Sequence, residues 1–165
     1  MYGECRILGE LNMQESINFA AVSPQGYKAM KDLEMHVRSS GIEHVLLELV
    51  KTRVSEINGC AYCIDMHTRD ARAAGDSEQR LHALAAWQDT PFFSERERAA
   101  LKWAEALTRI PNARVPESLM EETLLCFGAD ELVSLTFAII AINGWNRLAI
   151  ASKLPAGSYK LGEHG

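Results

Sequence analysis

The sequence contains no block rich in lysine and arginine, and its acidic residues outnumber its basic ones. There are 17 Lys and Arg against 22 Asp and Glu, which gives a formal net charge of −5 at pH 7. Nucleic acids and anionic membranes are bound by clustered positive charge. We therefore expect neither a nucleic acid nor a membrane surface as a partner.

Long hydrophobic runs and targeting signals are missing as well. The longest apolar run, residues 135–142, includes Thr136 and is far shorter than the roughly 20 residues that cross a bilayer. Residues 1–8 contain no apolar segment preceded by basic residues, so no secretory signal is expected. These absences predict a cytoplasmic protein.

Strand-like alternation, internal repeats and low-complexity tracts are also absent, and there are only five prolines. Instead, apolar residues recur at helical spacing between clear start and stop signals. With 165 residues, we expect one all-α domain over residues 1–165, a bundle of about seven helices. The expected helices cover roughly residues 24–39, 42–57, 60–74, 77–87, 94–109, 117–127 and 130–153, followed by a loose tail.

Two of these helices have unusual faces. On residues 42–57, Glu48 shares a polar stripe with His44, Lys51, Thr52 and Ser55, a pattern typical of a solvated surface. On residues 130–153, the segment from Leu132 to Ile142 is apolar on nearly every side. Such a helix lies either at the centre of the bundle or at a contact between subunits, and we expect a homo-oligomer.

The residues with distinctive chemistry are gathered in one short stretch. Cys60, Cys63 and His67 follow an Asn58-Gly59 helix stop, and at about 100° per residue they fall within roughly a 60° arc of one helix. Four cysteines in a chain without an export signal indicate a reducing compartment, where a close pair is reactive or metal-binding rather than a static staple. Cys5 and Cys126 have no near partner in sequence, and we expect them to be bystanders.

The thiol pair has several competing explanations. A chance pair does not account for the histidine on the same face. Zinc prefers four ligands, this stretch offers three, and no second cluster completes a site, so no metal is expected. A c-type haem link needs a histidine directly after the second cysteine, where Ile64 stands, and no cofactor is expected.

Redox catalysis is the remaining explanation. Unpaired N–H groups at a helix start favour the thiolate, and His67 is placed to accept a proton from Cys63. A thiolate attacks peroxide oxygen, the resulting sulfenic acid condenses with the partner thiol, and a second dithiol reduces the disulfide. Helix-dipole reasoning alone favours Cys60, nearer the helix start, as the more acidic thiol.

The pattern Glu48-x11-Cys60-x2-Cys63-x3-His67 resembles the motif of AhpD-like alkylhydroperoxidases, within the carboxymuconolactone decarboxylase superfamily. The similarity extends over about residues 42–155, which form the expected core of the domain. It is carried also by the segments at residues 80–87, 90–97 and 141–147.

This resemblance implies an all-helical fold, a trimer or hexamer, and peroxidase activity on organic hydroperoxides or hydrogen peroxide with a dithiol reductant. It assigns peroxide attack to Cys63, resolution to Cys60, and proton relay to Glu48 and His67. The sequence departs from the family where the best-described relay has a histidine before the second cysteine. Tyr62 stands there, and we expect it to point away from the thiols and serve in packing.

Two other functions stay open. A carboxymuconolactone decarboxylase on the same scaffold does not need paired thiols, so Cys60 and Cys63 argue against it. A non-enzymatic redox-sensing protein would use the disulfide to change an interaction surface, and would oxidise once rather than turn over.

Overall fold

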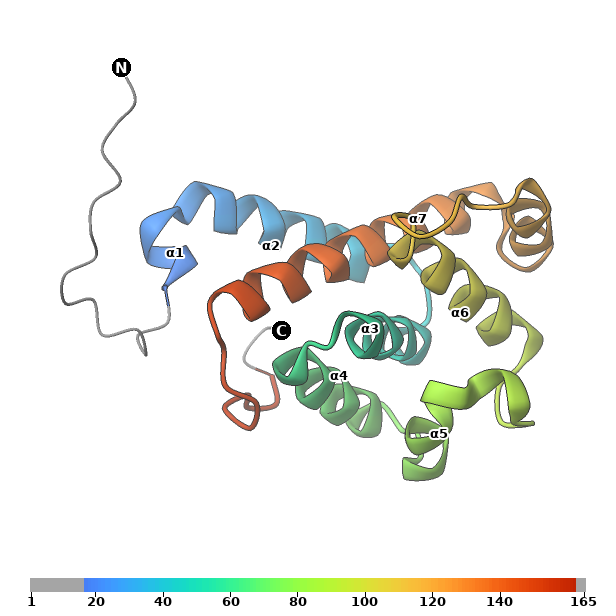
Figure 1. Ribbon diagram of the computed structural model, residues 1–165, viewed down its shortest axis with the longest axis horizontal. Helices are drawn as coiled ribbons and strands as arrows, with labels where there is room; N and C mark the ends of the chain where they lie inside the picture. The colour runs from blue at the N-terminus through green and yellow to red at the C-terminus, as the bar shows by residue number, and fades with distance from the viewer. Residues whose placement is uncertain (1–16, 163–165) are drawn as a thin grey trace, which may run out of the picture.

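A computed structural model describes residues 17–162 and shows seven α-helices, one 3₁₀ helix and no strand among them (Figure 1). The predicted all-α class is thereby confirmed. The helices are α1 (Phe19–Val22), α2 (Pro24–Arg38), α3 (His44–Asn58), α4 (Ala61–Ala73), α5 (Glu78–Ala83), η1 (Leu84–Asp89), α6 (Glu95–Thr108) and α7 (Glu117–Ala151).

The local signals in the sequence account for most of the helix ends. Ser94 and Glu97 form the predicted capping box at the start of α6. α3 ends at Gly59, whose φ of 69° lies in the left-handed region that glycine adopts without strain. Gly128, with φ 67° and ψ 173°, interrupts α7 where two separate helices were expected, so α7 consists of two helical segments joined at a kink.

α3 is the centre of the molecule. It lies between α7 and α4 and also contacts α6, while α2 packs along α7 (Figure 1). Ten consecutive residues, Leu46 through Ser55, are buried. The prediction of a solvated stripe was wrong for Glu48 and the polar residues after it on this helix, because the surrounding helices cover them; His44, in the first turn, is exposed. Thr52 and Ser55 tolerate burial since their hydroxyls donate to the carbonyls of Glu48 and Lys51.

α7 packs one face against the core and exposes apolar side chains on the other, including Val133, Phe137 and Ile140. Within the described residues it is the one helix long and apolar enough to cross a membrane by length and composition, a test that the core helix of a soluble protein also passes. Asn146, which is fully buried on α7, finds its hydrogen-bond partners within the chain. Its side-chain amide donates to Ser55 and accepts from Asn58.

Candidate active site

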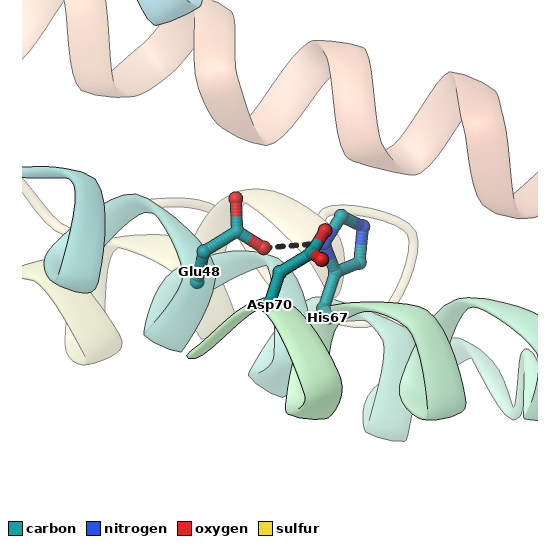
Figure 2. A group of neighbouring side chains, drawn as sticks. All are labelled: Glu48, His67 and Asp70. Atoms are coloured by element: carbon teal, nitrogen blue, oxygen red, sulfur yellow. Dashed lines mark hydrogen bonds and ion pairs between the residues drawn. The ribbon is translucent and has the colours of Figure 1, made fainter. Parts of the chain in front are cut away.

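The turn at Gly59 brings the candidate proton-relay residues together. Glu48 lies eleven residues before Gly59 on α3 and His67 eight residues after it on α4, distances of about 16 and 12 Å along the two helix axes. Because α3 and α4 pack against each other, the two side chains meet. Nδ1 of His67 lies 2.7 Å from Oε2 of Glu48, a hydrogen bond between two buried groups (Figure 2).

The two cysteines lie at the start of α4. Cys60 is the residue that caps the helix, and its sulfur accepts the backbone N–H of Cys63 at 3.4 Å. The two residues are joined by a disulfide, with their Cα atoms 5.3 Å apart, a spacing at which cysteines commonly bond. Cys126 is a free, half-buried thiol, and Cys5 lies outside the described residues.

A cavity of about 370 Å³ opens onto one of the two cysteines of the pair. Cys63 and His67 line it, one helical turn apart, whereas Cys60 does not. Tyr62 also lines this cavity, so the prediction that it points away from the site was wrong. Trp145 on α7 also lines the cavity and packs edge-on against Tyr27.

The carboxyl of Glu48 is charged in spite of its burial. Burial acts to raise its pKa, but the hydrogen bond and charge of His67, with Lys51 and His44 nearby, outweigh this and lower the pKa from 4.5 to about 2. Lys51 Nζ lies 3.5 Å from Oε1 of Glu48, and His44 Nδ1 lies 3.8 Å from the same oxygen. Glu48 is therefore a fixed negative charge behind the imidazole.

Lys51 extends the buried network to a second carboxylate. Its ammonium group lies 2.5 Å from Oε1 of Glu34 on α2, and Arg38 contacts the same oxygen at 3.3 Å. Burial acts to raise the pKa of Glu34, but Lys51 and Arg38 lower it below its ordinary value. Sequence reasoning missed the pairing of Lys51 with Glu34, because the two residues lie on different helices, seventeen positions apart in sequence.

A tyrosine from the carboxyl-terminal segment contacts α4 one turn after His67. The hydroxyl of Tyr159 donates to Oδ1 of Asp70 at 2.7 Å, and burial together with that carboxylate raises the pKa of Tyr159 to about 12. The segment expected to be a loose tail is therefore docked on α4, and Asp65 fixes it further by accepting the N–H of Gly157.

Glu48, His67 and Asp70 each offer one ligand atom within 4.8 Å of the others, a spacing that could hold a metal ion (Figure 2). Oε2 of Glu48 is already bonded to Nδ1 of His67, and Oδ1 of Asp70 accepts from Tyr159. Because these short hydrogen bonds link the residues to one another and to Tyr159, we interpret the cluster as a hydrogen-bonded unit.

We expect the Glu48–His67 pair to make stability depend on pH. The folded pKa of Glu48, about 2, lies below its ordinary 4.5, so the stabilisation is complete above pH 4.5 and is lost as the pH falls towards 2. A difference of this size corresponds to on the order of 3 kcal/mol. Urea unfolding between about pH 6 and about pH 2 measures the free energy of unfolding of the native protein and of Glu48→Gln. The difference between the two should shrink by that amount as the pH falls. A difference that does not change with pH would contradict the assignment.

Comparison with known proteins agrees with this architecture. A model of the carboxymuconolactone decarboxylase family matches residues 24–106, from α2 through most of α6. The chain belongs to this family. The uncharacterized protein YdfG of Bacillus subtilis (strain 168) is 42% identical over 139 residues, which cover 84% of this chain and 95% of that relative.

Solved structures place the chain near the AhpD-like members of the family. A protein of unknown function from Agrobacterium tumefaciens, described as a candidate antioxidant defence protein AhpD, superposes with a TM-score of 0.84 at 40% identity. The match covers 88% of this chain and all of that one. The debrominase Bmp8, solved with 2,3,4-tribromopyrrole, has a TM-score of 0.75 at 20% identity over 84% of this chain and 74% of its own, and so shares the fold. The resemblance to AhpD-like proteins is confirmed.

Proposed function

We propose that the protein is a thiol peroxidase that reduces organic hydroperoxides or hydrogen peroxide through Cys60 and Cys63. One observation carries the proposal. Cys63 lines a cavity together with a buried histidine whose Nε2 has no hydrogen-bond partner among the described residues, while its Nδ1 is bonded to Glu48. An imidazole held in this way has one nitrogen available for proton transfer beside a thiol.

The proposed cycle starts from the reduced pair. Nε2 of His67 takes the proton of the Cys63 thiol, and the thiolate attacks the outer oxygen of the hydroperoxide. The O–O bond breaks, Cys63 becomes a sulfenic acid, and the departing alkoxide takes up the proton and leaves as an alcohol. The Cys60 thiol then displaces hydroxide from the Cys63 sulfur, and water leaves as the disulfide forms.

Reduction of the disulfide completes the cycle. An external dithiol transfers two electrons and two protons by thiol–disulfide exchange and is itself oxidised to a disulfide. The net reaction converts one hydroperoxide and one dithiol into one alcohol, one water and one disulfide. The cycle requires a reducing compartment, which supports a cytoplasmic location.

Geometry favours Cys63 over Cys60 as the attacking thiol. Cys63 lines the cavity and lies one turn from His67, whereas Cys60 is outside the cavity lining and its sulfur accepts the N–H of Cys63. Access to substrate and to a base outweighs the small difference in helix dipole between adjacent positions. We assign the resolving role to Cys60.

We further propose that the protein is a homo-oligomer, a trimer or hexamer, as the family resemblance implies. The apolar face that α7 exposes supports a contact between subunits, because large exposed apolar groups on one face are typical of such interfaces. This face includes Val133, Phe137 and Ile140.

Turnover distinguishes the peroxidase from its rivals. The reduced protein, given excess cumene hydroperoxide and dithiothreitol, is expected to consume many equivalents of hydroperoxide per thiol pair. Without a reductant, a redox sensor would consume about one equivalent of hydroperoxide. With dithiothreitol it would still show no sustained consumption. Cys126→Ser is the matched control and should turn over normally, since Cys126 is a free thiol outside the cavity lining. Absence of turnover together with decarboxylation of a muconolactone would instead support the other family activity.

A further inference from the structure

The cavity above Cys63 is larger and more apolar than hydrogen peroxide requires. Its volume of about 370 Å³ is within the usual range for small-molecule sites and many times the roughly 30 Å³ of one water. Apolar and aromatic side chains from α2, α4 and α7 form most of its wall. They include Tyr27, Met35, Met66, Trp145 and Leu148. Binding an apolar ligand against such a wall is favourable, because it removes apolar surface from water.

The charges on this wall do not cancel. Three charged side chains of α2 line the cavity, namely Lys31, Glu34 and Arg38. Glu34 is neutralised by Arg38 and by the buried Lys51 behind it, and Lys51 also contacts Glu48. Lys31 is exposed, and no described residue forms an ion pair with it. The cavity therefore carries one uncompensated positive charge in a chain whose net charge is −5.

The position of Lys31 places that charge away from the thiol. It lies one helical turn before Glu34 on α2, and its exposure puts it at the rim, whereas Cys63 and His67 are buried at the floor. A ligand that satisfies both ends has an anionic head at the rim, an apolar chain along the wall, and its reactive group at the sulfur. Cations would be repelled, and an uncharged ligand would leave Lys31 unused.

We infer that the cavity takes an amphipathic monocarboxylate, and that the substrate is the hydroperoxide of a long-chain carboxylic acid. The carboxylate binds Lys31 at the rim, and the hydroperoxide on the apolar chain reaches Cys63. The second half of this inference rests on the proposed peroxidase function. The product is then the corresponding hydroxy acid, formed by the same net reaction that converts a hydroperoxide and a dithiol into an alcohol, water and a disulfide.

The kinetic test compares the 13-hydroperoxide of linoleic acid with its methyl ester, using dithiothreitol as reductant. The native protein is expected to prefer the acid in kcat/KM by about three- to fivefold, the effect of one partly exposed ion pair. Lys31→Met should reduce the acid-to-ester ratio to about one. The matched control is Lys28→Met, one turn earlier on α2, where the lysine pairs with Asp32 outside the cavity lining; it should keep the native ratio. Equal kcat/KM for acid and ester in the native protein, or an unchanged ratio in Lys31→Met, would overturn the inference.

A binding test separates this inference from the peroxidase proposal. Unoxidised linoleic acid, titrated below its self-association concentration, is expected to change the tryptophan fluorescence through Trp145, and Trp145→Phe should lose most of the signal. Affinity should fall about three- to fivefold in Lys31→Met. If this dependence is seen but no hydroperoxide is reduced, the ligand class stands and the peroxidase proposal fails. If hydroperoxides are reduced but linoleic acid does not bind, the ligand class is overturned and the peroxidase stands.

Discussion

Replacing Cys63 with serine is expected to lower the rate of hydroperoxide reduction by at least about 10³-fold, because a serine hydroxyl is not ionised at neutral pH and cannot form a sulfenic acid. Cys63 lines the cavity beside His67, so the first chemical step takes place on its sulfur. The measurement is steady-state consumption of cumene hydroperoxide with dithiothreitol as reductant. The substitution changes one atom at a fully buried position, and thermal unfolding will show whether the fold is kept.

Cys60→Ser is the matched comparison, since it removes the other sulfur of the same disulfide. It should still consume about one equivalent of hydroperoxide in a rapid first phase and leave a sulfenic acid on Cys63 that dimedone traps. Without added thiol the cycle then stalls, because the thiol of Cys60 that would condense with the sulfenic acid is gone. If instead Cys60→Ser abolishes the first phase and Cys63→Ser keeps it, the roles are reversed. That is the result predicted by the helix dipole alone, which favours Cys60 as the more acidic thiol.

Replacing His67 with glutamine is expected to slow the attack step by about 10²- to 10⁴-fold, the usual effect of losing a general base. The glutamine amide can still donate to Glu48, so the buried carboxylate stays hydrogen-bonded and the fold is spared. Stopped-flow measurement of the first turnover isolates this step from disulfide reduction. A first-turnover rate within about threefold of the native value would show that the thiol ionises without the imidazole.

Glu48→Gln tests how the base is held. The carboxylate accepts the proton of Nδ1, which leaves Nε2 free to act as the acceptor. A glutamine amide can donate to Nδ1 instead, which places the proton on Nε2 and removes the base. Glu48 is therefore a positioning residue. Its loss should change the pH profile of the first turnover as well as its rate, whereas a purely structural role would leave the shape of the profile unchanged.

Much of the site could be predicted because it depends on local spacing. The interval between Cys60 and Cys63 brings both thiols to the start of α4, and the histidine one turn after Cys63 shares its helix face regardless of the rest of the chain. The Asn58-Gly59 stop predicts a turn, and helices of similar length on both sides of it bring Glu48 to His67. The association of Glu48 with the site nevertheless came from the family resemblance, because its polar stripe alone indicated a solvated surface.

The errors have a common cause. The stripe on α3 and the direction of Tyr62 both depend on which neighbour covers each face of a helix, and periodicity does not report this. Tyr159 was assigned to a loose tail because its partner Asp70 lies 89 positions away in sequence.

The amino-acid sequence by itself determined the helical class, the ends of most helices and the placement of two thiols and an imidazole close together at the start of one helix, since each depends on interactions within a few residues. Tertiary structure alone decided that α3 is buried on all sides, that Lys51 joins Glu34 to Glu48, and that Cys63 rather than Cys60 lines the cavity. These features arise from packing between distant segments, where desolvation forces charged groups to find partners and the shapes of several helices together enclose a space.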